Sequence, residues 1–243
     1  MKNIWSTSGR LFLLILLSFS SLVMLLILRF MLAGKLMQGY LLWNLILAIV
    51  PALISWAILK HTEYFEQNGW HGAVNIAGFF AWLIFYPNAP YVFTDFIHVI
   101  NRSNLGYVAA PWLSRLDLLW FDIILNAAFA FVGHFMGLLS MYFMQVSLRK
   151  LYGRTVSWVA ILPAVVLSGI GIHLGRFSRY NSWDMVFHPI DTFQAILKIF
   201  TVPSALLFSL AFSFFIAITY IMFYIVIKPD TAVAHTANSS KSS

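Results

Sequence analysis

Apolar runs close to the length of a bilayer span recur along this chain, and they constrain its fold more than any other feature. A transmembrane helix needs about 20 predominantly apolar residues. With 61% hydrophobic and only 9% charged residues, the chain has no polar stretch long enough to form a soluble domain. The apolar runs cover approximately residues 11–28, 40–59, 72–86, 118–146, 156–174 and 203–227. The sequence therefore predicts an all-α, polytopic membrane helix bundle of about six transmembrane helices.

The two ends of the chain differ in character. Residues 11–28 are longer than the apolar segment of a signal peptide, which is about 7–15 residues, so we expect an uncleaved first span. Residues 229–243 are rich in Ser, Thr and Ala, which favours a disordered polar tail. We expect residues 1–228 to form the integral membrane domain. Before the last span, apolar residues 193, 196, 197 and 200 recur at helical spacing, which predicts a short helix in the membrane interface.

Charge and cysteine content exclude several classes of function. The net charge is +7, but the basic residues are scattered around the spans, which suits lipid headgroups and not a nucleic acid. The chain has no cysteine, so disulfides, thiolate catalysis and Cys-bound metals are excluded. The expected partner is therefore the lipid bilayer itself.

Six spans place both ends of the chain on one side of the membrane. Lys and Arg number eight on that side and seven on the other, which favours cytoplasmic ends. Whatever the orientation, the loops that follow the third and fifth spans share a side. Five of the eight acidic residues fall on that shared side: Asp95, Asp117, Asp122, Asp184 and Asp191.

A first polar string, residues 85–98, follows the third span. Pro87 and Pro90 break the helix because proline lacks an N–H and restricts the residue before it. The freed carbonyls need partners, which Asn88 or the hydroxyls of Tyr91 and Thr94 are placed to supply. Irregular backbone at membrane depth is tolerated only where it packs in protein or lines a wet cavity. We therefore expect a broken third span beside a cavity.

Beyond the prolines, Thr94 is expected to cap a new helix whose first turn contains Asp95. Asp95 and His98 are three residues apart and share one face of that turn. A carboxylate and an imidazole that converge suit a divalent metal ion or an acid/base pair. The alternative is a capped helix whose His98 only anchors at the interface.

A second polar string, residues 171–184, follows the fifth span. Gly171 and Gly175 form a small-xxx-small pair that allows another helix to approach closely. Arg176 and Arg179 offer planar guanidinium groups that suit an anion such as a lipid phosphate. The alternative is that these arginines neutralise the acidic residues at the same membrane face. Asn181 to Asp184 is typical of a turn.

The fourth span has one polar, small-residue face. Asp122, Asn126, Gly133, Gly137 and Ser140 lie within about 60° of one another at 100° per residue. This face is expected to pack against other helices, with the two glycines at the closest point. Asp122 is the member nearest to the two polar strings, so we add it to Asp95 and His98 as a candidate site residue. His134 lies off this face, and we expect it to form an interhelical hydrogen bond.

These strings also resemble a known family. The chain is similar to DUF1361, a family of bacterial multi-pass membrane proteins defined only as a domain of unknown function. The resemblance covers about residues 43–189 and rests on Trp43, Asn44, Pro51, Trp82, Phe85, the string Pro87–Tyr91, Thr94, Asp95, His98, the string Trp120–Asp122, Gly133, Gly137, Ser140, the string Gly175–Phe177, Arg179 and the string Asn181–Asp184. It implies location in a bacterial inner membrane and a shared architecture, and it brings no activity.

Three functions remain open at this point. The first is an enzyme that acts on a lipid-linked substrate, with Asp95, His98 and Asp122 as catalytic residues or as ligands of a divalent metal. The second is a small transporter or channel that uses the broken span. The third is a non-catalytic assembly protein. For an anionic or lipid-linked guest, the expected binding residues are Asn88, Tyr91, Arg176, Arg179, Asn181 and Asp184.

Overall fold

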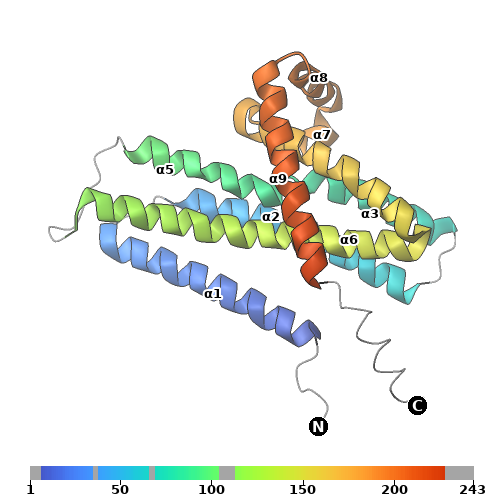
Figure 1. The fold of residues 1–243 in the computed structure, drawn as a ribbon, viewed down its shortest axis with the longest axis horizontal. Helices are drawn as coiled ribbons and strands as arrows, with labels where there is room; N and C mark the ends of the chain where they lie inside the picture. Colours follow the sequence, from blue (N-terminus) through green and yellow to red (C-terminus); the bar gives the residue numbers. More distant parts are fainter. Residues whose placement is uncertain (1–6, 35–37, 66–68, 104–112, 228–243) are drawn as a thin grey trace, which may run out of the picture.

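The computed structural model describes residues 7–34, 38–65, 69–103 and 113–227, and these fold as helices joined by short connections (Figure 1). The predicted tail, residues 229–243, lies outside the described residues. The helices are α1 (Thr7–Ala33), α2 (Gly39–Tyr64), α3 (Gly69–Phe85), α4 (Asn88–Tyr91), the 3₁₀-helix η1 (Val92–Asp95), α5 (Phe96–Ser103), α6 (Arg115–His173), the π-helix η2 (Leu174–Ser178), α7 (Asp184–Phe187), α8 (Pro189–Ile199) and α9 (Pro203–Ile227).

Five helical stretches among the described residues are long and apolar enough to cross a membrane, which confirms a polytopic helical membrane protein. The longest of them contains α6, which has 59 residues but is interrupted at Gly153, where φ is 85° and ψ is 175°. Glycine has no Cβ and adopts this backbone conformation readily. The two parts of α6 on either side of Gly153 correspond to the predicted fourth and fifth spans, so the described residues divide into six apolar segments that match the prediction.

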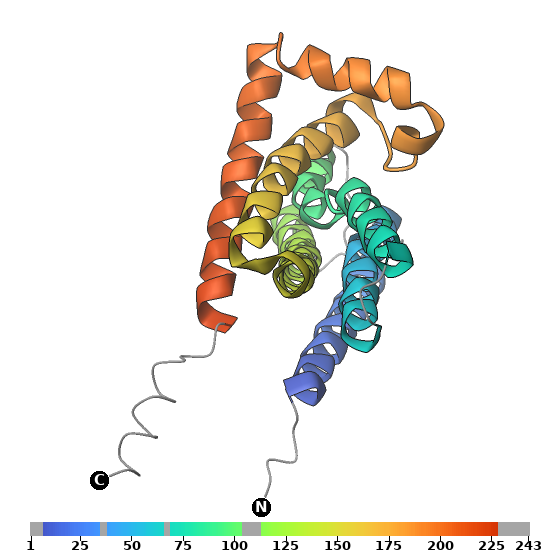
Figure 2. The ribbon, with the colours of Figure 1, turned by 90° about the vertical axis from the view of Figure 1, so that its right-hand side faces the viewer.

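The two parts of α6 lead into different regions of the molecule. The first part runs alongside α2, and α1 also packs against α6 (Figure 1). After Gly153 the chain turns back towards α7 and α8, and α9 then packs against α6. In Figure 2, α8 runs across the end of α9, as expected for a helix in the membrane interface. The start of α1 and the end of α9 lie at the same side of the molecule (Figures 1 and 2), as an even number of spans requires.

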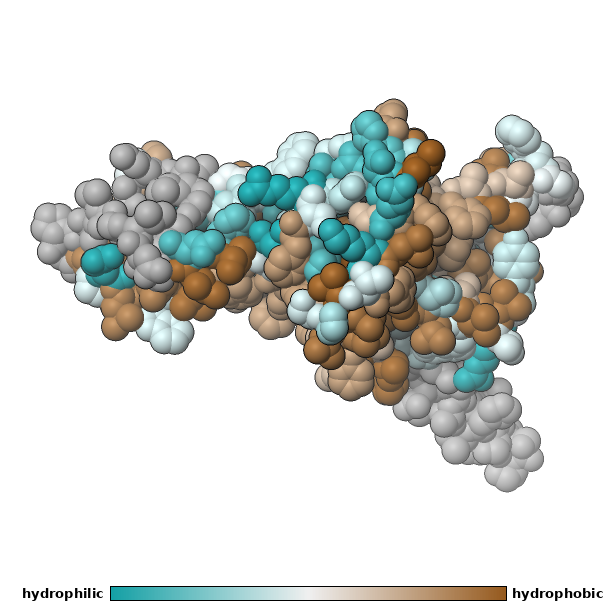
Figure 3. Space-filling view, turned by 90° about the horizontal axis from the view of Figure 1, so that it is seen from above, coloured by the Kyte–Doolittle hydropathy of each residue, from teal (hydrophilic) through white to brown (hydrophobic). Residues whose placement is uncertain are grey.

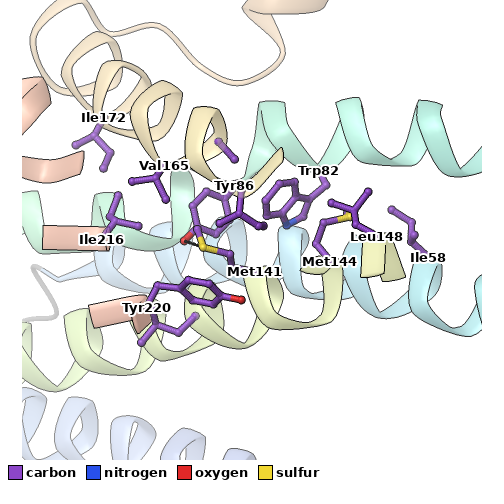
Figure 4. Close-up of a cluster of buried hydrophobic side chains, with 13 residues drawn as sticks. Ile58, Trp82, Tyr86, Met141, Met144, Leu148, Val165, Ile172, Ile216 and Tyr220 are labelled. Carbon is purple, nitrogen blue, oxygen red and sulfur yellow. Dashed lines mark hydrogen bonds between the residues drawn. The ribbon is translucent and has the colours of Figure 1, made fainter. Parts of the chain in front are cut away.

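Aromatic, aliphatic and small polar side chains fill the centre of the bundle. Trp82 and Tyr86 are fully buried beside Met141 (Figure 4). Inside this cluster, Trp82 Nε1 and Ser55 Oγ both donate hydrogen bonds to Ser140 Oγ, at 2.8 and 3.2 Å. Buried polar contacts of this kind and close packing hold helices together where lipid replaces water. Ser140 therefore lies on the face of α6 that packs against other helices, as the sequence predicts.

The outside of the bundle is largely apolar. Large hydrophobic side chains are exposed on most of the helices, including Leu207, Phe214 and Ile225 of α9. The face in Figure 3 shows such side chains next to a group of hydrophilic ones. Exposed apolar surface of this extent is expected where a protein contacts lipid tails.

The segment between α3 and η1 is the predicted break in the third span. The α-helix stops at Phe85, and the amide N–H of Ala89 bonds the Tyr86 carbonyl three residues back. The free carbonyl of Phe85 accepts a hydrogen bond from Asn88 Nδ2 at 2.9 Å, which confirms the expected use of this amide. The prediction that Thr94 caps a new helix is wrong. Its hydroxyl donates to the Tyr91 carbonyl at 2.7 Å, because the chain stays helical through η1 and leaves no helix start to cap.

Glycines of the first part of α6 pack against one side of this broken segment. A Cβ added to Gly137 would lie 2.8 Å from the Cβ of Ala89. A Cβ added to Gly133 would lie 2.9 Å from Cγ2 of Val92. Contacts this short need glycine, so the predicted close approach along this face of α6 is confirmed.

Glycines of the second part of α6 and of η2 pack against the other side. A Cβ on Gly171 would meet Pro87 at 2.8 Å, and one on Gly175 would meet the ring of Tyr91 at 3.1 Å. The irregular backbone is therefore held between two helical stretches that are far apart in the sequence. This packing fixes the position of the side chains that the segment presents, and it satisfies the requirement that irregular backbone be enclosed by protein.

Candidate functional site

Among the described residues, Asp122 is one of two buried carboxylates that bind an arginine. Arg29 of α1 contacts it with two nitrogens, Nε to Oδ1 at 2.6 Å and Nη2 to Oδ2 at 3.1 Å. Gln38 Nε2 donates a further hydrogen bond to Oδ1 at 3.0 Å. Arg29 and Asp122 are 1% and 2% exposed. A charge inside a membrane protein is expensive unless paired, and here the pair is forked and enclosed by protein.

Asp95, at the end of η1, is the second such carboxylate and is also buried. Arg176 Nη2 donates to its Oδ1 at 3.0 Å, and Asn44 Nδ2 of α2 donates to its Oδ2 at 2.7 Å. The Arg176 guanidinium lies 5.1 Å from the centre of the Tyr91 ring. Arg176 therefore neutralises an acidic residue, which was one of the two interpretations of this arginine from sequence.

A series of contacts connects the two carboxylates. His98 Nε2 lies 3.9 Å from Asp95 Oδ1, and the His98 ring stands 4.3 Å from the ring of Tyr40. The Tyr40 hydroxyl donates to Asn126 Oδ1 at 3.0 Å, and Asn126 Nδ2 donates to the Asp122 carbonyl at 2.8 Å. The polar face of α6 and the first polar string are therefore neighbours, although the two carboxylates belong to separate ion pairs.

The expected three-residue metal site from Asp95, His98 and Asp122 is not assembled. Among the described residues, no group of three or more His, Asp or Glu side chains could hold a metal ion. The physical reason is that both oxygens of Asp122 face Arg29, and those of Asp95 face Arg176 and Asn44. Each carboxylate has cations or amides where a metal ion would bind.

A cavity of about 650 Å³ lies next to the Asp95 pair. Its walls come from α2, from the end of α3 and α4, from the second part of α6, and from the chain that runs from η2 through α8. Leu47, Leu83, Ile84, Leu167 and Ile170 contribute apolar surface. The polar residues of the lining include Asn44, Asn88, Tyr91, Arg179, Asn181 and Ser182.

Four of the six predicted binding residues line this cavity: Asn88, Tyr91, Arg179 and Asn181. Arg176 lies behind Tyr91, and Asp184 accepts a hydrogen bond from the Asn181 backbone N–H at 2.6 Å, which shapes the turn. Asp95, His98 and Asp122 are not among the lining residues. The cavity lining thus contains four of the predicted binding residues and none of the predicted catalytic ones.

Arg179 has the least ordinary backbone of the lining residues. It directly follows the π-helix η2 and adopts a left-handed conformation with φ 59° and ψ 29°. A left-handed non-glycine residue costs about 1–2 kcal/mol, and short π-helices occur frequently at functional sites. Arg179 is exposed, and no hydrogen bond or ion pair joins its side chain to another residue of the described part. Its guanidinium is therefore available to a guest.

A family model described as "Protein of unknown function (DUF1361)" matches residues 43–219. The chain belongs to this family. Comparisons with curated proteins and with solved structures found no match. The DUF1361 match includes every residue that lines the cavity, and it begins after Arg29 and Gln38 of the Asp122 pair.

Sequence reasoning missed several partners within and beside the DUF1361 region. Arg29 directly follows the predicted first span, residues 11–28, and an arginine next to an apolar run is a signal for a buried partner. Asn44 was part of the family resemblance, but an amide inside a span also indicates a polar contact in its own right. Ser182, whose Oγ accepts a hydrogen bond from Asn88 at 2.9 Å, lies in the predicted turn but has no signal of its own.

Proposed function

We propose that this protein binds an anionic, lipid-like amphiphile in the cavity beside the broken third span. The observation that supports this best is the mixed lining of the cavity. One part is aliphatic and aromatic, and another part combines amide groups with the guanidinium of Arg179. A guest that satisfies both parts has a hydrocarbon portion and a polar group with negative charge.

The apolar part of the cavity reaches the lipid-facing surface. Trp43 and Phe80 line the cavity and are also 55% and 57% exposed. In a membrane protein, exposed large apolar side chains on the spans contact lipid tails. A molecule already dissolved in the bilayer therefore has a sideways route between α2 and α3.

The polar part suits a phosphate or carboxylate. A guanidinium forms short, paired, charge-assisted hydrogen bonds with such groups. Arg179 follows the end of a spanning segment, where anionic headgroups are found. Asp95 and His98 do not line the cavity, so we assign Asp95 to positioning, through Asn44 and Arg176, and not to proton transfer or metal binding.

The test uses native mass spectrometry to measure how tightly the purified protein binds dioleoylphosphatidylglycerol (DOPG). The same measurement with dioleoylphosphatidylcholine gives the comparison. Arg179→Gln should weaken DOPG binding by about tenfold, since one charge-assisted hydrogen bond contributes about 1.5 kcal/mol. The matched control is Arg154→Gln, an exposed arginine that lies outside the cavity lining. DOPG binding that is no stronger than that of phosphatidylcholine, or that is equal in both variants, would overturn the proposal.

We further infer a bacterial inner membrane location with both ends of the chain in the cytoplasm. The contacts of two arginines strengthen the charge count. Arg29 and Arg176 pair with buried carboxylates, so we do not count them among the basic residues that set the orientation. The opposite side then has five basic residues, against eight on the side of the two chain ends. A fluorescent protein fused to the C-terminus should be bright in bacterial cells, while a fused alkaline phosphatase should be inactive. The reverse pattern would contradict this orientation.

A further inference from the structure

Asn44 has a fixed amide orientation. Its contact on Asp95 is Oδ2 of a carboxylate whose other oxygen, Oδ1, is paired with Arg176. A carboxylate of this kind only accepts hydrogen bonds, so the NH₂ group of Asn44 must face it. The carbonyl oxygen of Asn44 has no hydrogen bond with any other described residue. Asn44 lines the cavity, so an acceptor is what it can offer to a guest.

The side-chain amide of Asn88 is also fixed, with its nitrogen facing protein acceptors, and the reason is independent of Asn44. Its Nδ2 donates to the Phe85 carbonyl and to Ser182 Oγ, both at 2.9 Å. A backbone carbonyl has no proton to give, so the nitrogen of Asn88 must face it. Both N–H bonds are then used, and within the described part of the chain its carbonyl oxygen has no partner either. Asn88 also lines the cavity.

We propose that the guest has a headgroup with hydrogen-bond donors, such as the hydroxyls of a polyol or sugar, next to its anionic group. This inference rests on the proposed binding of an anionic amphiphile, and it narrows the class of headgroup. The two amide oxygens need donors, whereas the oxygens of a phosphate or carboxylate only accept and are repelled by them. Arg179 supplies the donors that the anionic group requires.

The physical basis is the cost of unpaired acceptors. A guest that covers an amide oxygen without donating to it removes the water that would otherwise bond there. Sites built to bond a hydroxyl discriminate strongly against analogues that lack it, because the polar groups of the site are left unpaired. The cavity should therefore distinguish between lipids of equal charge and equal chain length.

The experiment compares DOPG with dioleoylphosphatidylmethanol in the native mass spectrometry titration. The two lipids have the same acyl chains and the same single negative charge, but only DOPG has free hydroxyls. The wild-type protein should bind DOPG at least about tenfold more tightly. In Asn44→Ala and Asn88→Ala this preference should shrink towards onefold, because the oxygens that discriminate between the two lipids are gone. Asn101→Ala, at an exposed position of α5, is the matched control and should keep the preference.

The outcomes separate this inference from the function on which it rests. Equal affinity of the wild-type protein for both lipids, with both weakened by Arg179→Gln, would overturn the inference and leave anionic amphiphile binding intact. Failure of both lipids to bind would overturn the proposed function. A DOPG preference that survives in both asparagine variants would also overturn the inference. The wild-type comparison requires no substitution, so it stands even if a variant fails to fold.

Discussion

Asp122 and Asp95 are both buried carboxylates that bind an arginine, yet their surroundings differ. The Asp122 pair lies between α1 and α6, and Gln38 completes a set of partners that are all buried. In the Asp95 pair, Arg176 is 16% exposed. Two residues in contact with that pair, Asn44 and Tyr91, line the cavity.

The comparison shows that two ion pairs of the same chemistry differ in role. The role of each pair depends on the residues that surround it. An enclosed pair ties two helices together and has no guest to meet. A pair whose contacts form the wall of a cavity also determines how that wall is presented. The family match is consistent with this distinction, since it covers both residues of the Asp95 pair and starts after Arg29.

The largest expected effect comes from breaking the enclosed pair. Arg29→Met leaves the Asp122 carboxylate buried without its cation, and removal of one partner of a buried pair costs about 3–5 kcal/mol. The free energy of unfolding, measured by denaturant titration in detergent, should fall by that amount. The DOPG affinity of the folded protein should not change. A loss below about 1 kcal/mol would show that the pair is not a structural tie.

The second largest effect is expected from breaking the ion pair of Asp95, which lies beside the cavity. Asp95→Asn removes the charge that Arg176 and Asn44 contact, and hydrogen bonds to charged groups contribute about 1.5–3 kcal/mol. The unfolding free energy should fall within this range, and DOPG affinity should fall as well because Asn44 and Tyr91 lose their support. Asp191→Asn, at an exposed position of α8, should change neither quantity. Unchanged DOPG affinity in Asp95→Asn would remove the distinction between the two pairs.

The third effect tests how the broken span is held. Gly137→Ala places a methyl group 2.8 Å from Ala89, and overpacking of this kind costs about 1–3 kcal/mol. Gly72→Ala is the matched control, because no atom lies within 4 Å of a Cβ at that position. The control should be neutral or slightly stabilising, since alanine favours helix more than glycine does. Equal unfolding free energies for the two variants would argue against tight packing around the segment.

The smallest effect concerns Arg179. Arg179→Gly relieves the left-handed strain and should raise the unfolding free energy by about 1 kcal/mol or less, since glycine also gains entropy in the unfolded state. DOPG binding should nevertheless weaken as in Arg179→Gln. Arg179→Gln retains the strain, so it should show no gain in stability. A gain in both variants would mean that the side chain, and not the backbone, is the source of the strain.

Much of the fold could be predicted because the signals are local. Pro87 interrupts a helix through its own geometry, and Asn88 is close enough in sequence to bond the carbonyl that is freed. The glycine pairs indicate close packing wherever their helix finds a partner. Pro203 marks the start of the last span, and α9 begins there.

The contents of the site depended on contacts that local patterns do not encode. Arg29 and Asp122 are 93 residues apart, and no sequence signal specified which carboxylate this arginine would meet. Grouping Asp95 with Asp122 as metal ligands assumed that residues on one membrane face converge. Each of these two carboxylates instead pairs with an arginine, because an unpaired charge in the bundle is energetically costly. The sequence predicts a cavity beside the broken span. It does not predict that the two carboxylates lie outside the lining of that cavity.

The Arg29 to Asp122 contact has a consequence for biosynthesis. The arginine emerges in the first span, and its carboxylate follows 93 residues later. During that interval its guanidinium has no acid to neutralise it and must extend to the headgroups or to water. The first helix can enter the bilayer early, but it can settle against the bundle only after the fourth spanning segment has been made. Assembly of this membrane protein is thereby ordered in time by one pair of side chains.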